Sequence, residues 1–86
     1  MHYNLEKAGV LFKLARKGNW GASYDRTEHF RRFQKLHEAI KELQKSQWLI
    51  LHKKPKYLGI SLNPKNKKEI INFIETKMPY LKGYIR

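Results

Sequence analysis

Three lysines lie close together in the chain, at Lys53, Lys54 and Lys56, with Pro55 before the last of them. The stretch around them, WLILHKKPKYLGISL, has an apolar segment on each side, which is typical of two strands joined by a tight turn. Lysine is a flexible point charge suited to phosphate, so these residues, the tip lysines, are candidates for binding a phosphate backbone. Lysine and proline at a tip would also keep the turn soluble and block pairing with another strand edge.

The charge of the whole chain favours the first of these two roles. Its 86 residues include 19 Lys and Arg but 7 Asp and Glu, which gives a formal net charge of +12. Self-repulsion at this charge destabilises a folded chain, so the excess indicates an anionic partner, with nucleic acid as the leading candidate. A membrane surface would require a basic amphipathic helix with a free apolar face, whereas the apolar faces of this chain are needed for its core.

A second set of polar side chains precedes the hairpin. Leu36, Ile40 and Leu43 recur at helical spacing and predict a helix over about 34–45 whose opposite face meets solvent. The candidates for nucleic-acid contacts on this helix are Gln34, Lys35, His37, Lys41 and Lys45. Its two acids, at positions 38 and 42, oppose dense contact with phosphates, and the mixture of charges fits an ordinary solvated helix equally well.

The segment before this helix carries three arginines. Asp25 followed three residues later by Glu28 resembles a capping box, which predicts a second helix that begins near Arg26. The candidates for backbone contacts on this second helix are Arg26, Arg31 and Arg32. Apolar residues continue at helical spacing without Gly or Pro, so residues 27–46 could form one long helix or two short ones.

No pattern in the sequence indicates catalysis. The chain has no Cys, which excludes thiol catalysis, disulfides and cysteine-based zinc sites. The four histidines share no metal-ligand spacing, and neither a Ser-His-acid order nor a glycine-rich phosphate loop is present. We therefore expect a protein that is not an enzyme, with no catalytic residues, no metal site and no cofactor.

Local patterns predict the elements that would position these side chains. A wide apolar stripe over 5–17 predicts a central, well-buried helix, and alternation with a period of two predicts the hairpin over 48–62. In the second arm of the hairpin, the alternation assigns Gly59 and Ser61 to an open face. The dipeptide at 63–64, Asn-Pro, is a helix start signal and predicts a helix over 64–77.

The length of the chain is that of one domain over 1–86, with its core over about 5–78. The tail over 79–86 is apolar enough to dock on this core. No apolar run is long enough to span a bilayer, and the N-terminus lacks a signal-peptide core. We therefore expect an intracellular, cytoplasmic protein.

The order of these elements, with the stretches GNWGASYDRTEHF and AIKELQKSQWLILHKKPKYLGISLNPKNKKEIINFIE, resembles the small winged helix-turn-helix proteins of archaea. The resemblance covers about 5–78 and implies an α+β fold of three to four helices with a two-stranded β-hairpin wing. It implies sequence-specific binding of double-stranded DNA in transcription regulation, with a recognition helix over about 34–45 and a basic wing over 53–56. Members often have Gly or Pro in the turn before the recognition helix, where this chain has residues 32–34, Arg-Phe-Gln.

Other partners fit the same sequence. Proteins of this kind commonly pair, so a homodimer through the last helix and the tail is expected. Trp20, Tyr24 and Trp48 could stack on unpaired bases, which would instead make this an RNA-binding or single-stranded nucleic-acid-binding protein. A protein-protein interaction module that uses the apolar tail over 79–86 is a further alternative.

Overall fold

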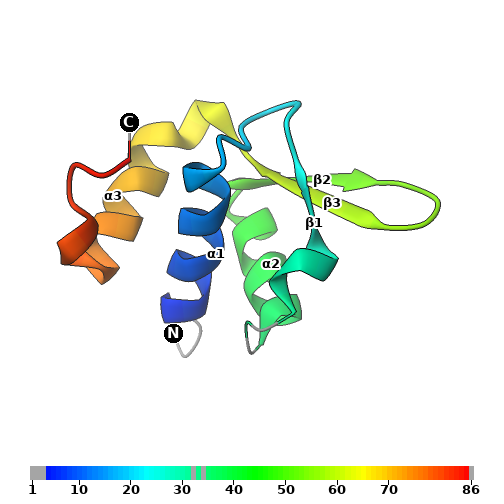
Figure 1. Ribbon diagram of the computed structural model, residues 1–86, viewed down its shortest axis with the longest axis horizontal. Coiled ribbons are helices and arrows are strands. Elements are labelled where there is room, and N and C mark those ends of the chain that lie inside the picture. Colours follow the sequence, from blue (N-terminus) through cyan, green and yellow to red (C-terminus); the bar gives the residue numbers. More distant parts are fainter. Residues whose placement is uncertain (1–3, 32, 34, 86) are drawn as a thin grey trace.

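Over the residues that the structure describes, three α-helices and a three-stranded antiparallel sheet form an α+β protein (Figure 1). The computed structural model describes residues 4–31, 33 and 35–85. In chain order the elements are α1 (Asn4–Arg16), β1 (Asp25–Arg26), η1 (Thr27–Phe30), α2 (Leu36–Lys45), β2 (Leu49–Lys53), β3 (Leu58–Leu62), η2 (Pro64–Asn66), α3 (Lys67–Lys77) and η3 (Pro79–Leu81), where η marks a short 3-10 helix.

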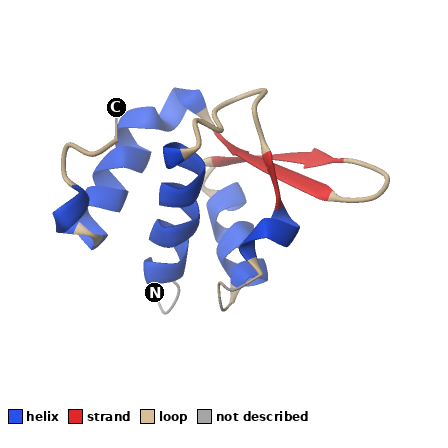
Figure 2. Ribbon diagram, in the orientation of Figure 1, coloured by secondary structure: helices blue, strands red, loops and turns tan. Residues whose placement is uncertain are grey.

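The strands follow the order β1-β3-β2, so β3 lies in the middle of the sheet (Figure 2). β2 and β3 pair from Leu49 opposite Leu62 to Lys53 opposite Leu58, which confirms the predicted hairpin. The expectation of only two strands is wrong, because β1 pairs with the other edge of β3. A two-residue strand is too short to show alternation, so the sequence pattern could not reveal it.

A helical segment begins next to Arg26, at Thr27, as predicted, but it is the short 3-10 helix η1 and the predicted capping box does not form. Asp25 and Arg26 are extended in β1, and no side chain caps η1, which follows them. The Asp25 carboxylate instead accepts hydrogen bonds from the side chains of Lys17 and His29 and from the backbone N–H of Arg26. Asp25, the expected cap of the helix, is therefore hydrogen-bonded to Lys17, just after α1, and to two residues close to it in the chain.

Residues 27–46 do not form one long helix. The 3-10 helix η1 ends at Phe30, and α2 begins at Leu36 after Lys35, which adopts a left-handed conformation with φ of 58°. Two of the predicted contact residues, Arg32 and Gln34, lie in the connection and outside the described residues.

The start signal of the last helix is confirmed in a modified form. The Asn63 side chain accepts a hydrogen bond from the backbone N–H of Lys65, as a cap does, and Pro64 opens the first turn. That turn is the 3-10 helix η2, and α3 continues from Lys67. None of the helices described has both the length and the apolar character needed to cross a membrane.

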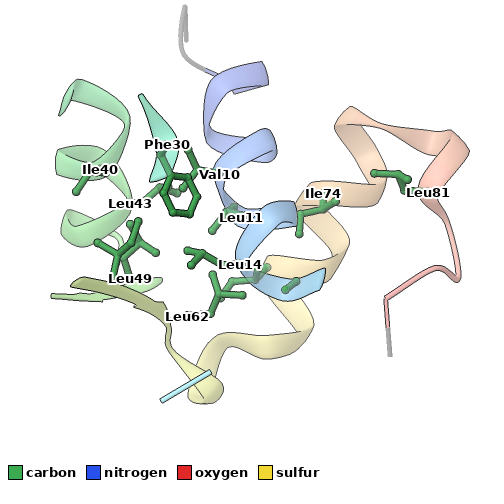
Figure 3. Packing of buried hydrophobic residues seen from close by; sticks show 13 residues of the cluster. Val10, Leu11, Leu14, Phe30, Ile40, Leu43, Leu49, Leu62, Ile74 and Leu81 are labelled. Carbon is green, nitrogen blue, oxygen red and sulfur yellow. The ribbon is translucent and has the colours of Figure 1, made fainter. Parts of the chain in front are cut away.

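The core surrounds α1, as its wide apolar stripe predicts (Figure 3). Leu11 and Leu14 are fully buried among Phe30 from η1, Leu62 from β3 and Ile74 from α3. Burial of each such side chain contributes roughly 1.5 to 3 kcal/mol to the stability of the fold. Because its buried residues share one core with those of η1, β3 and α3, α1 connects these elements. The tail docks in part through a buried residue at position 81, Leu.

The predicted open face of β3 is covered. Gly59 and Ser61 are both buried, whereas the alternation pattern assigned them to solvent. Tyr24 lies over Gly59, where an added Cβ atom would be 2.4 Å from the ring, and the Ser61 hydroxyl donates to the backbone oxygen of Gly21. The loop between α1 and β1 therefore packs on a strand that is distant in sequence, which periodicity alone does not predict.

Candidate nucleic-acid interface

A groove of about 500 Å³ lies between α2, η1 and the β2-β3 hairpin. Its apolar lining residues are Leu36, Ile40, Leu51 and Leu58. The other side chains that line it are Thr27, Glu28, Arg31, His37, Lys41 and Gln44. The groove therefore combines an apolar lining with the cations Lys41 of α2 and Arg31, which lies just after η1.

The amphipathic sequence of α2 places its polar side chains on this groove and on the adjoining solvent face. Ala39, Ile40 and Leu43 are buried, which directs His37 and Lys41 outward. The exposed set on and just before α2 contains four of the predicted contact residues, Lys35, His37, Lys41 and Lys45. Lys35 precedes the helix and the other three lie on it, and contacts of these residues with bases remain a prediction.

One of the two acids on α2 has a partner within the fold. The Lys7 ammonium donates to the Glu42 carboxylate at 2.8 Å, and this hydrogen bond holds the pKa of Glu42 below its usual range. The pair joins α2 to α1 and reduces the repulsion that Glu42 would exert on a phosphate. Glu38 remains exposed beside Lys41 and Lys45.

The tip of the hairpin is tight and basic. The Lys54 N–H donates to the Tyr57 backbone oxygen at 3.1 Å, which leaves Pro55 and Lys56 at the turn. All three tip lysines are exposed, and among the described residues no carboxylate lies within 4.0 Å of their ammonium groups.

The side chains of the adjacent residues Lys53 and Lys54 point to opposite faces of the hairpin. Lys53 pairs with Leu58, and cross-strand partners share a face, so Lys53 lies on the side of the groove that Leu58 lines. The Lys54 ammonium lies 5.6 Å from the centre of the Tyr24 ring, on the other side of the sheet. The basic tip therefore presents charge in two directions, as the alternation of side chains along a strand leads one to expect.

The three predicted arginine contacts do not form one set. Arg26 lies in β1, and its guanidinium is 4.1 Å from the centre of the Tyr57 ring, on the sheet face turned away from α2. Arg31 follows η1 and lines the groove. The placement of Arg26 on a helix is wrong, because Arg26 pairs with Gly59 of β3 and is therefore part of a strand.

Rings gather on the sheet face turned away from α2. Tyr24 stacks on His52 with their centres 4.5 Å apart, and its hydroxyl is 2.7 Å from that of Tyr57. This hydrogen bond, together with burial, raises the pKa of Tyr24 above its ordinary value. Sequence analysis proposed Tyr24 as a stacking residue but missed Tyr57 and His52. The glycine at position 59, opposite His52, was the available signal of a close approach.

The two tryptophans contact other parts of the fold. Trp48 packs edge-on against Phe73 of α3, with ring centres 5.4 Å apart, and Trp20 lies near the Lys67 ammonium. Both indoles are half-buried. Across the described part of the chain, no group of three His, Asp or Glu side chains is arranged to hold a metal ion.

Comparisons with protein-family models, curated proteins and solved structures gave no match for this chain. The function of this chain is therefore inferred from the geometry and the charges of its own residues.

Proposed function

We propose that this protein binds double-stranded DNA in the manner of a winged helix, with α2 as the recognition helix and the β2-β3 hairpin as the wing. One observation carries the proposal: exposed cations of α2, of the residue just after η1 and of one face of the hairpin lie on the same side of the molecule, at the groove. Lys41 and Arg31 line it, and Lys53 leaves the hairpin on the same side. A duplex presents phosphates on both sides of its grooves, so one bound segment can meet all three.

The two walls of the groove have different roles in this proposal. Tip lysines can reach phosphates but carry no unique pattern of donors and acceptors, so the hairpin supplies affinity. His37 and Lys41, on an exposed helix face, can reach base edges in a major groove, which has room for a helix, so α2 supplies discrimination. Arg31 adds a backbone contact beside them.

A regulator of transcription that recognises a palindromic site acts as a dimer, and we extend the proposal to a homodimer through the last helix and the tail. Two tyrosines support it: Tyr80 is 80% exposed and Tyr84 is 66% exposed. Sedimentation at high salt, where attraction between charges is screened, is expected to give about twice the mass of one chain. A single-chain mass at every concentration would exclude this dimer.

Duplex binding is tested by titrating random-sequence duplex DNA, single-stranded DNA and duplex RNA over several salt concentrations. Each phosphate contact contributes about 0.9 to the slope of log affinity against log salt. Replacing all three tip lysines by Ala is therefore expected to reduce the duplex slope by about 1 to 2, according to whether Lys56 makes contact together with Lys53, because Lys54 lies over Tyr24 on the other face. The matched control is Ala at Lys68, Lys77 and Lys82, which removes the same charge from α3 and the tail, and sedimentation at high salt checks that this control has the same mass as the wild type.

The outcomes separate the proposed function from its alternatives. An equal loss of slope in both triple variants would mean that net charge alone attracts DNA. Preference for duplex RNA or for single strands over duplex DNA would move the function to those partners. Failure to bind any of the three would favour a protein-protein interaction module.

A further inference from the structure

The sheet face turned away from α2 carries rings and cations that the proposed duplex contact does not use. We name it the outer face, and its residues are Tyr24, Arg26, His52, Lys54 and Tyr57. Strand register places them together, because Arg26, Gly59 and His52 lie in one cross-strand row. The hairpin extends beyond the helices (Figure 1), and on the outer face Arg26 and Lys54 are exposed while the three rings are half-buried.

The rings of the outer face are held in place by one another. Tyr24 lies against Gly59, stacks on His52 and shares a hydrogen bond with Tyr57. The guanidinium of Arg26 covers Tyr57 at 4.1 Å from the ring centre. Because these contacts exist before a ligand arrives, a planar ligand would pay little to order the side chains it meets.

The outer face is basic as well as aromatic. Arg26 and Lys54 both lie over rings, at 4.1 and 5.6 Å from the ring centres of Tyr57 and Tyr24. Within the described part of the chain, the Arg26 guanidinium pairs with the carboxylate of Glu28, at a distance of 3.5 Å between half-exposed side chains. Such a surface pair is worth little, so the guanidinium is free to exchange Glu28 for a phosphate. Guanidinium planes and aromatic rings are the groups on which unpaired bases stack.

This combination fits a single strand better than a duplex. The bases of a duplex already stack on each other, so their faces cannot reach a ring on a sheet. An unpaired strand exposes both base faces and phosphates, and it can meet rings and cations at once. We infer that the outer face binds an unpaired DNA strand by stacking its bases beside Tyr57, Arg26 and Tyr24.

The hairpin tip suggests where this strand comes from. Lys53 and Lys54 are adjacent, about 3.8 Å apart at Cα, yet they leave opposite faces of the hairpin. A single strand that extends from a duplex bound at the groove side of the hairpin can therefore pass the tip and continue along the outer face. It would meet Lys53 before the tip and Lys54 after it. The source of the strand, a tail of bound duplex, rests on the proposed function, whereas binding by the outer face does not.

The experiment uses the full chain with four probes: a blunt duplex, the same duplex with a thymidine tail at either end, a free thymidine oligomer, and a uridine oligomer of the same length. Two variants change the outer face, Arg26→Gln and Tyr57→Leu. The matched control is Arg16→Gln, which removes a guanidinium that lies 5.8 Å from the Phe12 ring centre, away from the outer face. Blunt-duplex affinity and tryptophan fluorescence report whether each variant is folded.

The tail is expected to tighten binding of the duplex by about 5- to 30-fold, which corresponds to one or two stacked bases at the lower end of the range for stacking on an aromatic ring. Arg26→Gln and Tyr57→Leu are each expected to remove most of that gain while leaving the blunt duplex unaffected, and Arg16→Gln is expected to keep it. If Tyr57→Leu does not fold, Arg26→Gln decides the question, because its side chain is on the surface.

Three results would overturn the inference: a tail that adds nothing, a gain that survives both outer-face variants, or binding of a uridine oligomer but not of the thymidine one. If the blunt duplex fails to bind while the free thymidine oligomer binds and is weakened by Arg26→Gln, the proposed duplex function fails and the outer-face site stands. The converse pattern, duplex binding without any effect of the tail, would exclude the outer-face site and leave the proposed duplex function standing.

Discussion

Two groups of lysines in this protein have different surroundings. Lys7 in α1 and Lys17 just after it each donate to a carboxylate, Glu42 at 2.8 Å and Asp25 at 2.9 Å. The tip lysines of the hairpin lie within 4.0 Å of no carboxylate among the described residues. The cations near α1 thus stabilise contacts between elements, while those of the hairpin are left to solvent or to a partner.

The difference is one of burial as much as of pairing. The Asp25 side chain is 8% exposed and receives three hydrogen bonds, whereas the tip lysines are exposed on a projecting turn. A buried carboxylate without partners is costly, so the fold requires the cations that face Asp25. No comparable requirement holds the tip lysines, which is why changes at the two places are expected to have different consequences.

The largest effect is expected from Asp25→Ala. The change leaves Lys17, His29 and the Arg26 N–H without their acceptor and loosens β1, so the free energy of unfolding is expected to fall by about 2 to 3 kcal/mol. Urea unfolding measures this. Glu28→Ala, which removes a half-exposed carboxylate, serves as the control and is expected to change stability little. Equal losses in the two variants would contradict the contrast drawn above.

A smaller effect, on DNA rather than on stability, is expected at α2. Lys41→Ala is expected to weaken binding to the preferred duplex by about 1 to 3 kcal/mol, because a lost base contact costs that much, and to leave random-sequence binding nearly intact. Lys68→Ala in α3 is the control. The preferred site is first selected from random duplexes, and competition titrations then compare the variants. Uniform weakening on all sequences would make Lys41 a phosphate contact instead.

Adjacent tip lysines are expected to differ from each other. Lys53→Ala is expected to lower the salt slope for blunt duplex by about 0.9, the value for one phosphate, since this residue lies on the groove side. Lys54→Ala is expected to leave that slope unchanged, since its ammonium lies over Tyr24 on the outer face. The same slope change in both variants would show that the two faces of the hairpin are not distinguished by duplex DNA.

The smallest effect is a dependence of stability on pH. Burial of the Asp25 carboxyl opposes its ionisation, but hydrogen bonds from Lys17, His29 and the Arg26 N–H outweigh burial and lower its pKa. A group whose pKa is lower when folded contributes stability above its unfolded value, about 3.9, and loses it as the pH falls through the folded pKa. Between about pH 5 and about pH 3, the free energy of unfolding is therefore expected to fall more steeply in the wild type than in Asp25→Asn. Parallel curves would assign the acid sensitivity to other carboxylates.

Much of the fold followed from local rules. A wide apolar stripe predicted α1, the change of period from 3.6 to 2 predicted the hairpin, and Asn63 predicted the start of the last helical segment. In each case the determining residues lie within a few positions of one another. The exposed positions of Lys41 and of the tip lysines follow from the same patterns.

The features that local rules missed all depend on residues distant in the chain. β1 exists because Asp25 and Arg26 pair with Ile60 and Gly59, and no two-residue segment carries a periodic signal of its own. The outer face was missed for the same reason, since its rings come from the loop before β1 and from both arms of the hairpin. The predicted capping role of Asp25 failed because Lys17, eight residues earlier, is a competing partner that only the fold brings near.

The amino-acid sequence by itself determined the excess of positive charge, the helical and strand periods, and the presence of three lysines at a turn. Only the tertiary structure decided which cations are paired within the fold and which face outward. The packing of α1 against α2 brings Lys7 to Glu42 across 35 positions, and strand pairing sends Lys53 and Lys54 to opposite faces. Electrostatic interactions depend on distance in space and on burial, and neither quantity is fixed by composition or by local periodicity.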